Sequence, residues 1–594
     1  CFSRLSSLHS AFSPKMVSFL VSTLVIVLLA ALSFADVAPI SDLEAYNDGF
    51  IGQFPSQTFK SSDTVAPVFQ INTFEPNHVD ASGFLFLTME HGDKSGPAIF
   101  SSKDLSLVYA DIRYNTTFDA RAQVRNGGKY LTFIESGHCH AFDANYQKKW
   151  TVSIRDLGAT DANIHDCEFT TQGNALMTAY QDIIYNLTAL GGEMDGWLSD
   201  SIFQEVDLET DRVFSVWRSY THINLTDTMV KYNPKTTFMG GHGFDWFHID
   251  SVSKASHFPI LIDLADTLDP QWILGGKHNQ FKDLSGGGAT NFANQYDAKF
   301  VQGNESRISF FDNQGIETGL CNGGNCSRGV VVELDYDKMT VQLLHEFTHP
   351  QEVYSGSGGS VQGLDNGNFL VGWGANPGIT EHASNGTVVM DIQRGVVPYI
   401  PESDIDANMS IYRAWKMEWI GRPPWGPSIA SSAPGDDGFE VSIYVSWNGD
   451  TQVHHWEVYA GEDDRNVTSS PRLLANSSRV GFETEIGLEG LGLSLPRTVR
   501  AIAVSKSGKT LGSTVIVDLA SGKLNGNSSS IWKLKPQASD EEPSDRPDSK
   551  KKPDDEEDTA FQAKPSVSSL LALLLAIALY LSKFGISNLG AEIT

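Results

Sequence analysis

The chain has 594 residues and carries 72 acidic against 43 basic side chains, so its formal net charge is −29. This acidity excludes nucleic acid as a partner and a broad electrostatic attraction to anionic lipid, because both partners are themselves negative. One hydrophobic core is not enough for a chain of this length, which is expected to divide into two or three domains.

Residues 1–35 are predicted to be upstream residues and a secretory signal peptide. The chain starts at Cys1, and the residues before Met16 read as upstream translation. An apolar run follows Met16 and ends in Ser33-Phe34-Ala35, which is typical of a signal-peptide cleavage site. We therefore expect the protein to enter the secretory pathway and to be extracellular or held at the cell surface.

Asn-x-Ser/Thr sequons agree with this route, because such sites are glycosylated in exported proteins. The ten candidate acceptors are Asn115, Asn186, Asn224, Asn304, Asn325, Asn385, Asn408, Asn466, Asn476 and Asn527. They predict a glycosylated surface.

Four cysteines remain after the signal, an even number that predicts disulfides in an oxidising compartment. The Gly-rich loop between Cys321 and Cys326 favours a local bridge, which leaves Cys139 to pair with Cys167. Zinc binding is the weaker alternative, since neither pair has Cys-x-x-Cys spacing. No metal site and no cofactor are predicted.

Residues 36–422 are predicted to form an all-β domain. Short strand-like runs such as Phe84–Met89 and Asn368–Trp373 are separated by Gly, Asn and Asp, with almost no apolar pattern at helical period. An entry strand, a Gly or Asn-Gly turn and an apolar strand recur, and a repeated four-stranded unit of about 40 to 50 residues indicates propeller blades. The six candidate units predict a six-bladed β-propeller rather than a sandwich.

In a propeller the innermost strand of each blade borders a central channel, so residues at the entrances of these strands converge in space. His165, His248, Tyr296 and Ser360 occupy such entrance positions. We expect their side chains to meet although they are far apart in the sequence.

Residues 423–520 predict a β-sandwich of immunoglobulin or fibronectin-III type, because runs such as Val441–Trp447 alternate apolar and polar residues. Residues 521–565 are rich in Asp, Glu, Lys, Ser and Pro and predict a disordered acidic stalk. Residues 566–594 contain an apolar run that fits a short membrane helix or a lipid-anchor signal about equally well. Either would tether the protein to a membrane at its C-terminus.

Four motifs carry a resemblance to a known family. They are Gly-Phe-Asp-Trp-Phe-His-Ile-Asp-Ser-Val (243–252), Trp-Ile-Leu-Gly-Gly (272–276), Gln-Tyr-Asp-Ala (295–298) and Ile-Ser-Phe-Phe-Asp-Asn (308–313). In this order they resemble the arylsulfotransferase family of secreted β-propellers, particularly its fungal branch, over residues 50–519. The resemblance implies transfer of a sulfuryl group from a phenolic sulfate ester to a phenol without a nucleotide donor. Such chemistry needs a neutral imidazole as nucleophile, and positive charge or hydrogen-bond donors around the sulfate oxygens.

The resemblance also implies roles for individual residues. His165 and His248 match channel histidines of the family, and Tyr296 and Asp297 stand at the position of its nucleophile. The further candidates for substrate binding are His242, Lys254 and Lys277.

Two departures from the family pattern concern the chemistry. Tyr296 replaces a histidine, and a tyrosine with its ordinary pKa of about 10 is a poor nucleophile. No arginine lies between Gly240 and Arg307, so a strand with a Ser-x-Arg element is missing, through a truncated gene model or through true degeneration.

The sequence therefore predicts an arylsulfotransferase-like protein of full or impaired activity. A non-catalytic cell-surface binding or adhesion propeller is the alternative. A quinone-dependent dehydrogenase is disfavoured, because Trp150, Trp217 and Trp272 do not supply its repeated blade motif.

Overall fold

Nearly all regular structure in the chain is β-strand. The computed structural model describes residues 36–155, 157, 165–233, 243–254, 270–301, 304–315, 319–321, 326–397, 410–432, 441–488 and 496–532. Within these ranges the helices are short: α2 (Leu43–Asn47), α3 (Ser219–His222), α4 (Asn466–Ser469), and the 3-10 turns η1 (Thr188–Leu190) and η2 (Leu225–Asp227). The prediction of a β-protein is confirmed for this part of the chain.

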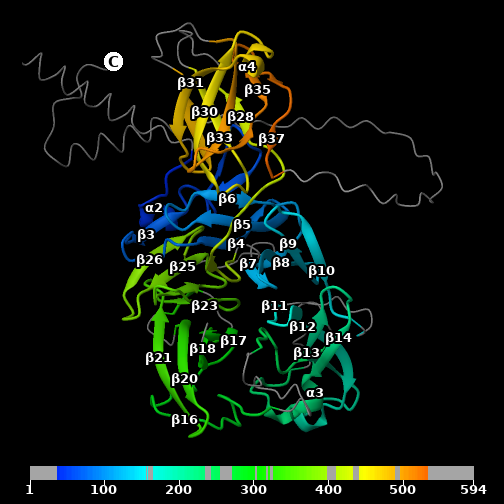
Figure 1. Ribbon diagram of the computed structural model, residues 1–594. Helices are drawn as coiled ribbons and strands as arrows, with labels where there is room; N and C mark the ends of the chain where they lie inside the picture. The colour runs from blue at the N-terminus through cyan, green and yellow to red at the C-terminus, as the bar shows by residue number, and fades with distance from the viewer. Residues whose placement is uncertain are drawn as a thin grey trace, which may run out of the picture. The chain divides into compact units, whose positions relative to one another are not determined.

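Five sheets of four or five mainly antiparallel strands account for most of residues 70–417, and Figure 1 shows them following one another around a common centre. Most neighbouring strands are also consecutive in the chain, an arrangement typical of propeller blades. The strands of the first sheet are β27 (Trp415–Met417), β4 (Phe84–His91), β5 (Lys94–Ser101) and β6 (Leu107–Ala110). Those of the second are β7 (Thr117–Arg125), β8 (Gly128–Glu135), β9 (His138–Phe142) and β10 (Lys148–Val152).

The other three sheets follow the same plan. The third has β11 (Cys167–Phe169), β12 (Asn174–Tyr185), β13 (Gly196–Asp207), β14 (Val213–Arg218) and β15 (Phe244–Asp245). The fourth has β17 (Gln295–Val301), β18 (Asn304–Asp312), β20 (Arg328–Asp335), β21 (Thr340–Thr348) and β16 (Lys282–Asp283). The fifth has β23 (Ser360–Gly363), β24 (Phe369–Gly372), β25 (Gly378–His382), β26 (Val388–Gln393) and β3 (Gln70–Phe74). Two small pairs complete this region: β1 (Ser56–Thr58) with β2 (Val65–Pro67), and β19 (Gly319–Leu320) with β22 (Val353–Tyr354).

Each end of this region adds a strand to a sheet that is otherwise formed near the opposite end of the region. Strand β3, near the start, pairs with β26 of the fifth sheet, and β27, at the end, pairs with β4 of the first sheet. The ring of sheets is therefore joined by hydrogen bonds contributed from both ends of the region.

Strand β4 shows why an apolar run becomes the middle of such a sheet. Its side chains point alternately to opposite faces, and both faces are covered. Leu85 and Leu87 lie in a hydrophobic cluster shared with the fifth sheet, whereas Phe86 lies in a cluster shared with the second sheet. A strand whose sheet is covered on both faces by neighbouring sheets therefore needs consecutive hydrophobic residues.

The region expected to supply a sixth blade contributes no separate sheet among the residues that the structure describes. Its two short strands join neighbouring sheets instead, β15 alongside β13 and β16 alongside β21. The Gly- and Asn-rich sequence from 275 to 294 has no apolar run long enough for a central strand. Residues 255–269, where a strand was expected to be missing, lie outside the described ranges.

Residues 428–530 form two further sheets around a hydrophobic core of their own, which contains Trp447 and Trp456. One sheet has β28 (Ser428–Ser431), β29 (Ser442–Ser446) and β32 (Glu483–Gly487). The other has β30 (Val453–Gly461), β31 (Arg472–Ser478), β33 (Thr498–Ser505), β34 (Thr510–Ser513), β35 (Ile516–Asp518), β36 (Leu524–Asn525) and β37 (Ser529–Ser530).

The first residues of the predicted stalk, 521–532, are ordered. Strands β36 and β37 lie inside the predicted stalk, and Trp532 donates a hydrogen bond from Nε1 to Asp450 at 3.1 Å. These residues are ordered because the sheet edge supplies backbone partners that the composition of the segment does not reveal. No helix in the described ranges could span a bilayer, and the predicted signal and membrane segment lie outside those ranges.

The predicted glycosylation sites lie at the surface wherever they are described. Seven of these asparagines are exposed and one, Asn304, is partly exposed. Asn325 and Asn408 lie outside the described residues.

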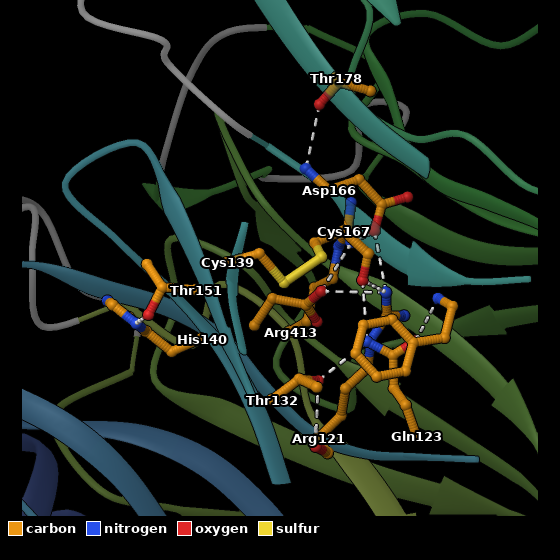
Figure 2. Close-up of a disulfide and its surroundings, with 12 residues drawn as sticks. Arg121, Gln123, Thr132, Cys139, His140, Thr151, Asp166, Cys167, Thr178 and Arg413 are labelled. Carbon is orange, nitrogen blue, oxygen red and sulfur yellow. Dashed lines mark hydrogen bonds and ion pairs between the residues drawn. A yellow bond between two sulfur atoms is a disulfide. The ribbon is translucent and has the colours of Figure 1, made fainter. Parts of the chain in front are cut away.

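Both predicted disulfides are present, Cys139 with Cys167 and Cys321 with Cys326. The first joins β9 of the second sheet to the start of β11 in the third, with both cysteines buried (Figure 2). The Cys167 carbonyl accepts hydrogen bonds from Arg121 and Gln123, each at 2.8 Å. The bridge therefore fixes the entrance of an inner strand.

Removing this bridge is expected to lower the free energy of unfolding measurably. The double substitution Cys139→Ala/Cys167→Ala should cost about 2–4 kcal/mol, because the bridge restricts a long loop of the unfolded chain. Cys321→Ala/Cys326→Ala is the control, with a smaller expected loss because its cysteines are only five positions apart. Urea unfolding of both variants measures the difference, and equal losses would contradict this explanation.

Candidate functional site

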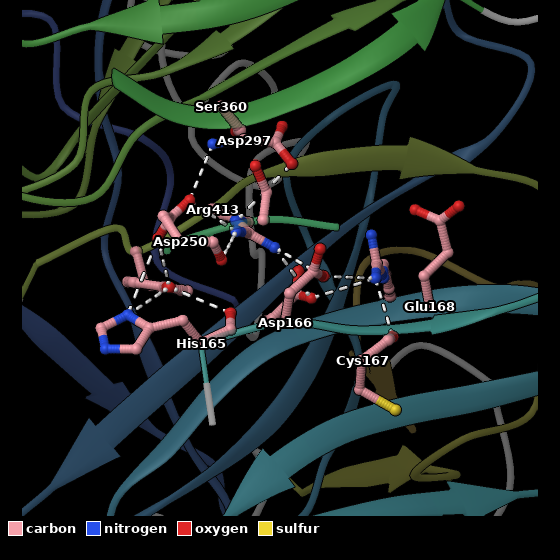
Figure 3. Close-up of polar contacts among 12 residues, drawn as sticks. His165, Asp166, Cys167, Glu168, Asp250, Asp297, Ser360 and Arg413 are labelled. Atoms are coloured by element: carbon pink, nitrogen blue, oxygen red, sulfur yellow. Dashed lines mark hydrogen bonds and ion pairs between the residues drawn. The ribbon is translucent and has the colours of Figure 1, made fainter. Parts of the chain in front are cut away.

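Six polar residues, five of them in or just before a strand, form what we call the axial ring. They are Asp119, Asp166, Asp250, Asp297, Ser360 and Arg413. Figure 3 shows Asp166, Asp250 and Asp297 gathered around the Arg413 side chain, with Ser360 nearby. Each comes from a different segment of the chain, so the convergence expected for Ser360 and for the Tyr296–Asp297 strand is observed.

Arg413 is the hub of this ring and is almost fully buried. Its Nη1 lies 3.0 Å from Asp166 and 3.3 Å from Asp119, and its Nη2 lies 3.0 Å from Asp250. Its Nε is 3.6 Å from Asp297. One guanidinium therefore contacts four carboxylates, which its planar fork of donors allows.

The ring and its neighbours hold more acids than permanent cations. Lys299 binds Asp166 and Glu168, and Arg121 lies 3.0 Å from Asp166. Five carboxylates thus meet three cations among the described residues: Asp119, Asp166, Glu168, Asp250 and Asp297 against Arg121, Lys299 and Arg413. Nowhere in the described ranges do three or more His, Cys, Asp or Glu side chains form a group that could hold a metal ion.

Unequal compensation separates the carboxylates by pKa. Burial raises the pKa of Asp297 to about 7, and Arg413 and Lys299 offset this only in part. Burial acts on Asp166 in the same direction, but Lys299, Arg413 and Arg121 together hold its pKa below the ordinary value. Neither carboxylate oxygen of Asp297 has a hydrogen-bond partner among the described residues. Asp297 is therefore the member of the ring that takes up a proton near neutral pH.

Beside the ring lies a second group, the histidine–tyrosine cluster. His165 and His248 approach each other edge to face with ring centroids 5.4 Å apart, and Tyr180 is 5.4 Å from each. Tyr296 lies 6.5 Å from His248, and Tyr412 lies 6.3 Å from His165 and 6.4 Å from Tyr296. The structure thus brings together both predicted histidines and Tyr296.

Each histidine is anchored through Nδ1. In His248, Nδ1 lies 2.6 Å from Asp245, a carboxylate that accepts hydrogen bonds. In His165, Nδ1 lies 3.2 Å from the Tyr412 hydroxyl and 3.6 Å from Asp250. An Nδ1 that donates a proton leaves the lone pair of a neutral imidazole on Nε2.

The surroundings raise the pKa of His248 and that of Tyr296. Burial lowers the pKa of His248, but the hydrogen bond and charge of Asp245 outweigh it, and the net pKa is raised. Burial, with the charge of Asp250, raises the pKa of Tyr296 well above its ordinary value. Tyr296 therefore stays a neutral phenol, which makes the residue at the expected nucleophile position a hydrogen-bond donor rather than a nucleophile. The backbone of His248 adopts a positive φ of 48°, which is uncommon outside glycine and is frequent at functional sites.

The other predicted binding residues are engaged elsewhere. The Lys254 ammonium pairs with Glu205 at 2.8 Å, and Lys277 donates to the carbonyls of Thr226 and Thr228. His242 lies outside the described residues.

Sequence reasoning missed Tyr412, Arg413 and Asp250. A signal for the first two was available, because four strand entrances share an aromatic or His residue, a charged residue, a small residue and then a larger one. They read Phe118-Asp119-Ala120-Arg121, His165-Asp166-Cys167-Glu168, Tyr296-Asp297-Ala298-Lys299 and Tyr412-Arg413-Ala414-Trp415. Aligning them identifies Arg413 as the basic member of an otherwise acidic column.

Comparisons with solved structures give weak matches. A Bacteroides caccae protein of unknown function is 13% identical, with 69% of this chain and 92% of that chain covered and a TM-score of 0.20. The periplasmic gluconolactonase of Pseudomonas aeruginosa is 10% identical, with coverages of 70% and 83% and a TM-score of 0.16. TM-scores this low carry no weight for fold or function.

A search of curated proteins finds no match. A family model does match, and its span includes both histidines of the cluster as well as Tyr296 and Asp297, but neither Tyr412 nor Arg413. Residues 133–395 of this chain thus match the family model of arylsulfotransferase (ASST).

Proposed function

We propose that the protein transfers a sulfuryl group from a phenolic sulfate ester to a phenol at the histidine–tyrosine cluster, without a nucleotide donor. The family match over residues 133–395 supports this reaction class. The observation that carries the proposal is the pairing of His165 with His248, whose rings lie 5.4 Å apart and whose Nδ1 atoms are each anchored by a neighbour. Such a pair can supply a nucleophile and a proton donor side by side.

The proposed mechanism gives the two histidines different roles. Nε2 of neutral His165 attacks sulfur, so that an N–S bond forms and the S–O bond to the donor phenol breaks. Protonated His248, whose pKa is raised, gives its proton to the departing phenolate. In the second half His248 takes a proton from the acceptor phenol, whose oxygen attacks sulfur while the N–S bond breaks. Protons and sulfuryl group balance over the two halves.

Protonated His248 also provides positive charge for the sulfate oxygens. Burial raises the pKa values of Tyr180 and Tyr296, and the negative charges of Asp245 and Asp250 raise them further. Activity should therefore fall as pH rises through the raised pKa of His248, because the imidazolium is lost.

Replacing His248 with glutamine should lower sulfuryl transfer by a factor of about 10² to 10⁴, the usual contribution of a general acid–base group. The assay follows nitrophenolate released from 4-nitrophenyl sulfate with phenol as acceptor. His138→Gln is the matched control, because His138 is an exposed histidine bonded only to a nearby carbonyl. Unchanged activity in His248→Gln, or no release above background by the unmodified protein, would refute the proposal.

A non-catalytic binding protein is the second candidate, favoured by the excess of carboxylates over cations around the axial ring. Under this reading the cluster binds a ligand without turning it over. The same assay separates the two, since a binder releases no nitrophenolate.

The wider architecture is also part of the proposal. We infer a six-bladed propeller followed by an immunoglobulin-like or fibronectin-III-like sandwich, exported, glycosylated and tethered at the cell surface. Five blade-type sheets, the separate core of residues 428–530 and the surface position of the described sequons support this view.

A further inference from the structure

We infer that Tyr412 is a positioning residue that sets the tautomer of His165, and that the segment from 410 to 417 completes the site from outside the family-matched region. This inference rests on the proposed function for its catalytic consequence but not for its structural content. Tyr412 reaches His165 across 247 positions of the chain.

The Tyr412 hydroxyl has three polar contacts and one proton. It lies 3.0 Å from the carbonyl oxygen of His165, 3.1 Å from Oδ1 of Asp250 and 3.2 Å from Nδ1 of His165. Burial raises the pKa of Tyr412 well above its ordinary value, so the hydroxyl keeps its proton.

Two of these three contacts can only accept a hydrogen bond. A carbonyl oxygen has no proton, and Asp250 is ionised, because Arg413 and His165 outweigh burial and hold its pKa low. The hydroxyl proton therefore points to Asp250 or to the carbonyl. The remaining contact must then run from Nδ1–H of His165 to the hydroxyl oxygen. Neutral His165 is thus the Nδ1–H tautomer, with its lone pair on Nε2, as the proposed nucleophile requires.

The neighbouring residue makes this arrangement rigid. Tyr412 and Arg413 hold the two oxygens of Asp250, the hydroxyl at Oδ1 and Nη2 at Oδ2, the latter at 3.0 Å. The Tyr412 carbonyl accepts from Gly359 at 2.9 Å, and its ring packs 5.3 Å from Phe118. These contacts fix the position of the Tyr412 hydroxyl relative to the axial ring.

The first test is the tautomer of His165 in the unmodified full chain. Nitrogen-15 NMR of protein labelled at histidine, with the signal assigned by its loss in His165→Gln, reports which nitrogen carries the proton. We expect Nδ1–H at a pH where the ring is neutral. A dominant Nε2–H form would overturn the inference without any variant having to fold.

The second test is Tyr412→Phe, which removes only the hydroxyl. We expect His165 to lose its preference for Nδ1–H, and kcat of sulfuryl transfer to fall by about 10- to 100-fold with little change in KM. Tyr114→Phe is the control, because its hydroxyl faces Asp111 at 3.5 Å, outside the cluster. An unchanged tautomer in Tyr412→Phe would overturn the inference. A shifted tautomer in a protein whose unmodified form transfers no sulfuryl group would refute the proposed function and leave the positioning role of Tyr412 standing.

Discussion

Arg413→Met is expected to destabilise the protein by about 3–5 kcal/mol or more, the usual result of removing one partner of a buried ion pair. The loss arises because Asp119, Asp166 and Asp250 remain buried without the guanidinium that now lies within 3.3 Å of each. Methionine fills similar volume, so the missing charge rather than a cavity dominates the effect. Urea unfolding at neutral pH measures it.

The dependence on pH gives this prediction a second readout. Without Arg413 the pKa of each ring carboxylate rises, because a neighbouring positive charge is lost, so the folded variant takes up protons more readily than the unmodified folded protein as pH falls. Arg413→Met should therefore regain part of its stability as pH falls from 8 toward 5, relative to the unmodified protein. Arg113→Met is the control, since Arg113 is largely exposed and pairs with Asp111 at the surface. Equal losses of unfolding free energy in the two variants would contradict the prediction that Arg413 stabilises the axial ring.

Acid is expected to destabilise the fifth sheet through two buried histidines. Burial lowers the pKa of His349 to about 3 and that of His382 to about 4. Both rings pack on aromatic side chains, His349 on Trp373 and His382 on Phe347. Protonation of either would place an uncompensated charge in the core.

The sign follows from comparing the two states. The unfolded chain binds these protons below about pH 6.5 while the folded chain resists until pH 3 to 4, so stability is lost as pH falls through this window. The loss should reach several kcal/mol by pH 4, because each pKa unit corresponds to about 1.4 kcal/mol. Asp297 and Asp391, whose pKa values burial raises to about 7 and about 6, act in the opposite direction and reduce the net loss.

A double variant isolates the histidine contribution. In His349→Asn/His382→Gln the amides retain hydrogen-bonding atoms close to those of the imidazoles but do not titrate. Thermal unfolding between pH 4 and 7 should show a smaller acid loss in this variant than in the unmodified protein. His78→Asn, at an exposed surface histidine paired with Glu75, should leave the acid loss unchanged. Parallel pH curves for the double variant and the unmodified protein would contradict the prediction.

The β-character of the fold could be predicted because it depends on local sequence patterns. Apolar runs such as Phe84–Met89, bounded by turn residues, identify central strands wherever they fall in a chain. The Gly-rich loop between Cys321 and Cys326 indicated one disulfide for a similarly local reason, and the pairing of Cys139 with Cys167 followed by elimination. The composition of the predicted stalk did not reveal β36 and β37, because these short strands are ordered by their pairing with β35 and β34.

Only part of the candidate site could be predicted from the sequence. His165, His248 and Tyr296 stand in recognisable motifs, and their convergence followed from the expected blade geometry. Lys254 and Lys277 were chosen for charge alone, and the structure engages both with other groups, because a lysine ammonium pairs with whichever acceptor its flexible side chain reaches.

The sequence by itself determined that this is a β-rich chain of repeated strand units with two histidines in recognisable motifs, since strand periodicity and motifs are properties of short segments. Only the tertiary structure decided that Arg413 pairs with the aspartates of four other segments and that Tyr412 contacts His165. Those contacts depend on β27 pairing with β4, strands more than 300 positions apart, and such pairing is fixed by the packing of the whole ring rather than by any local preference.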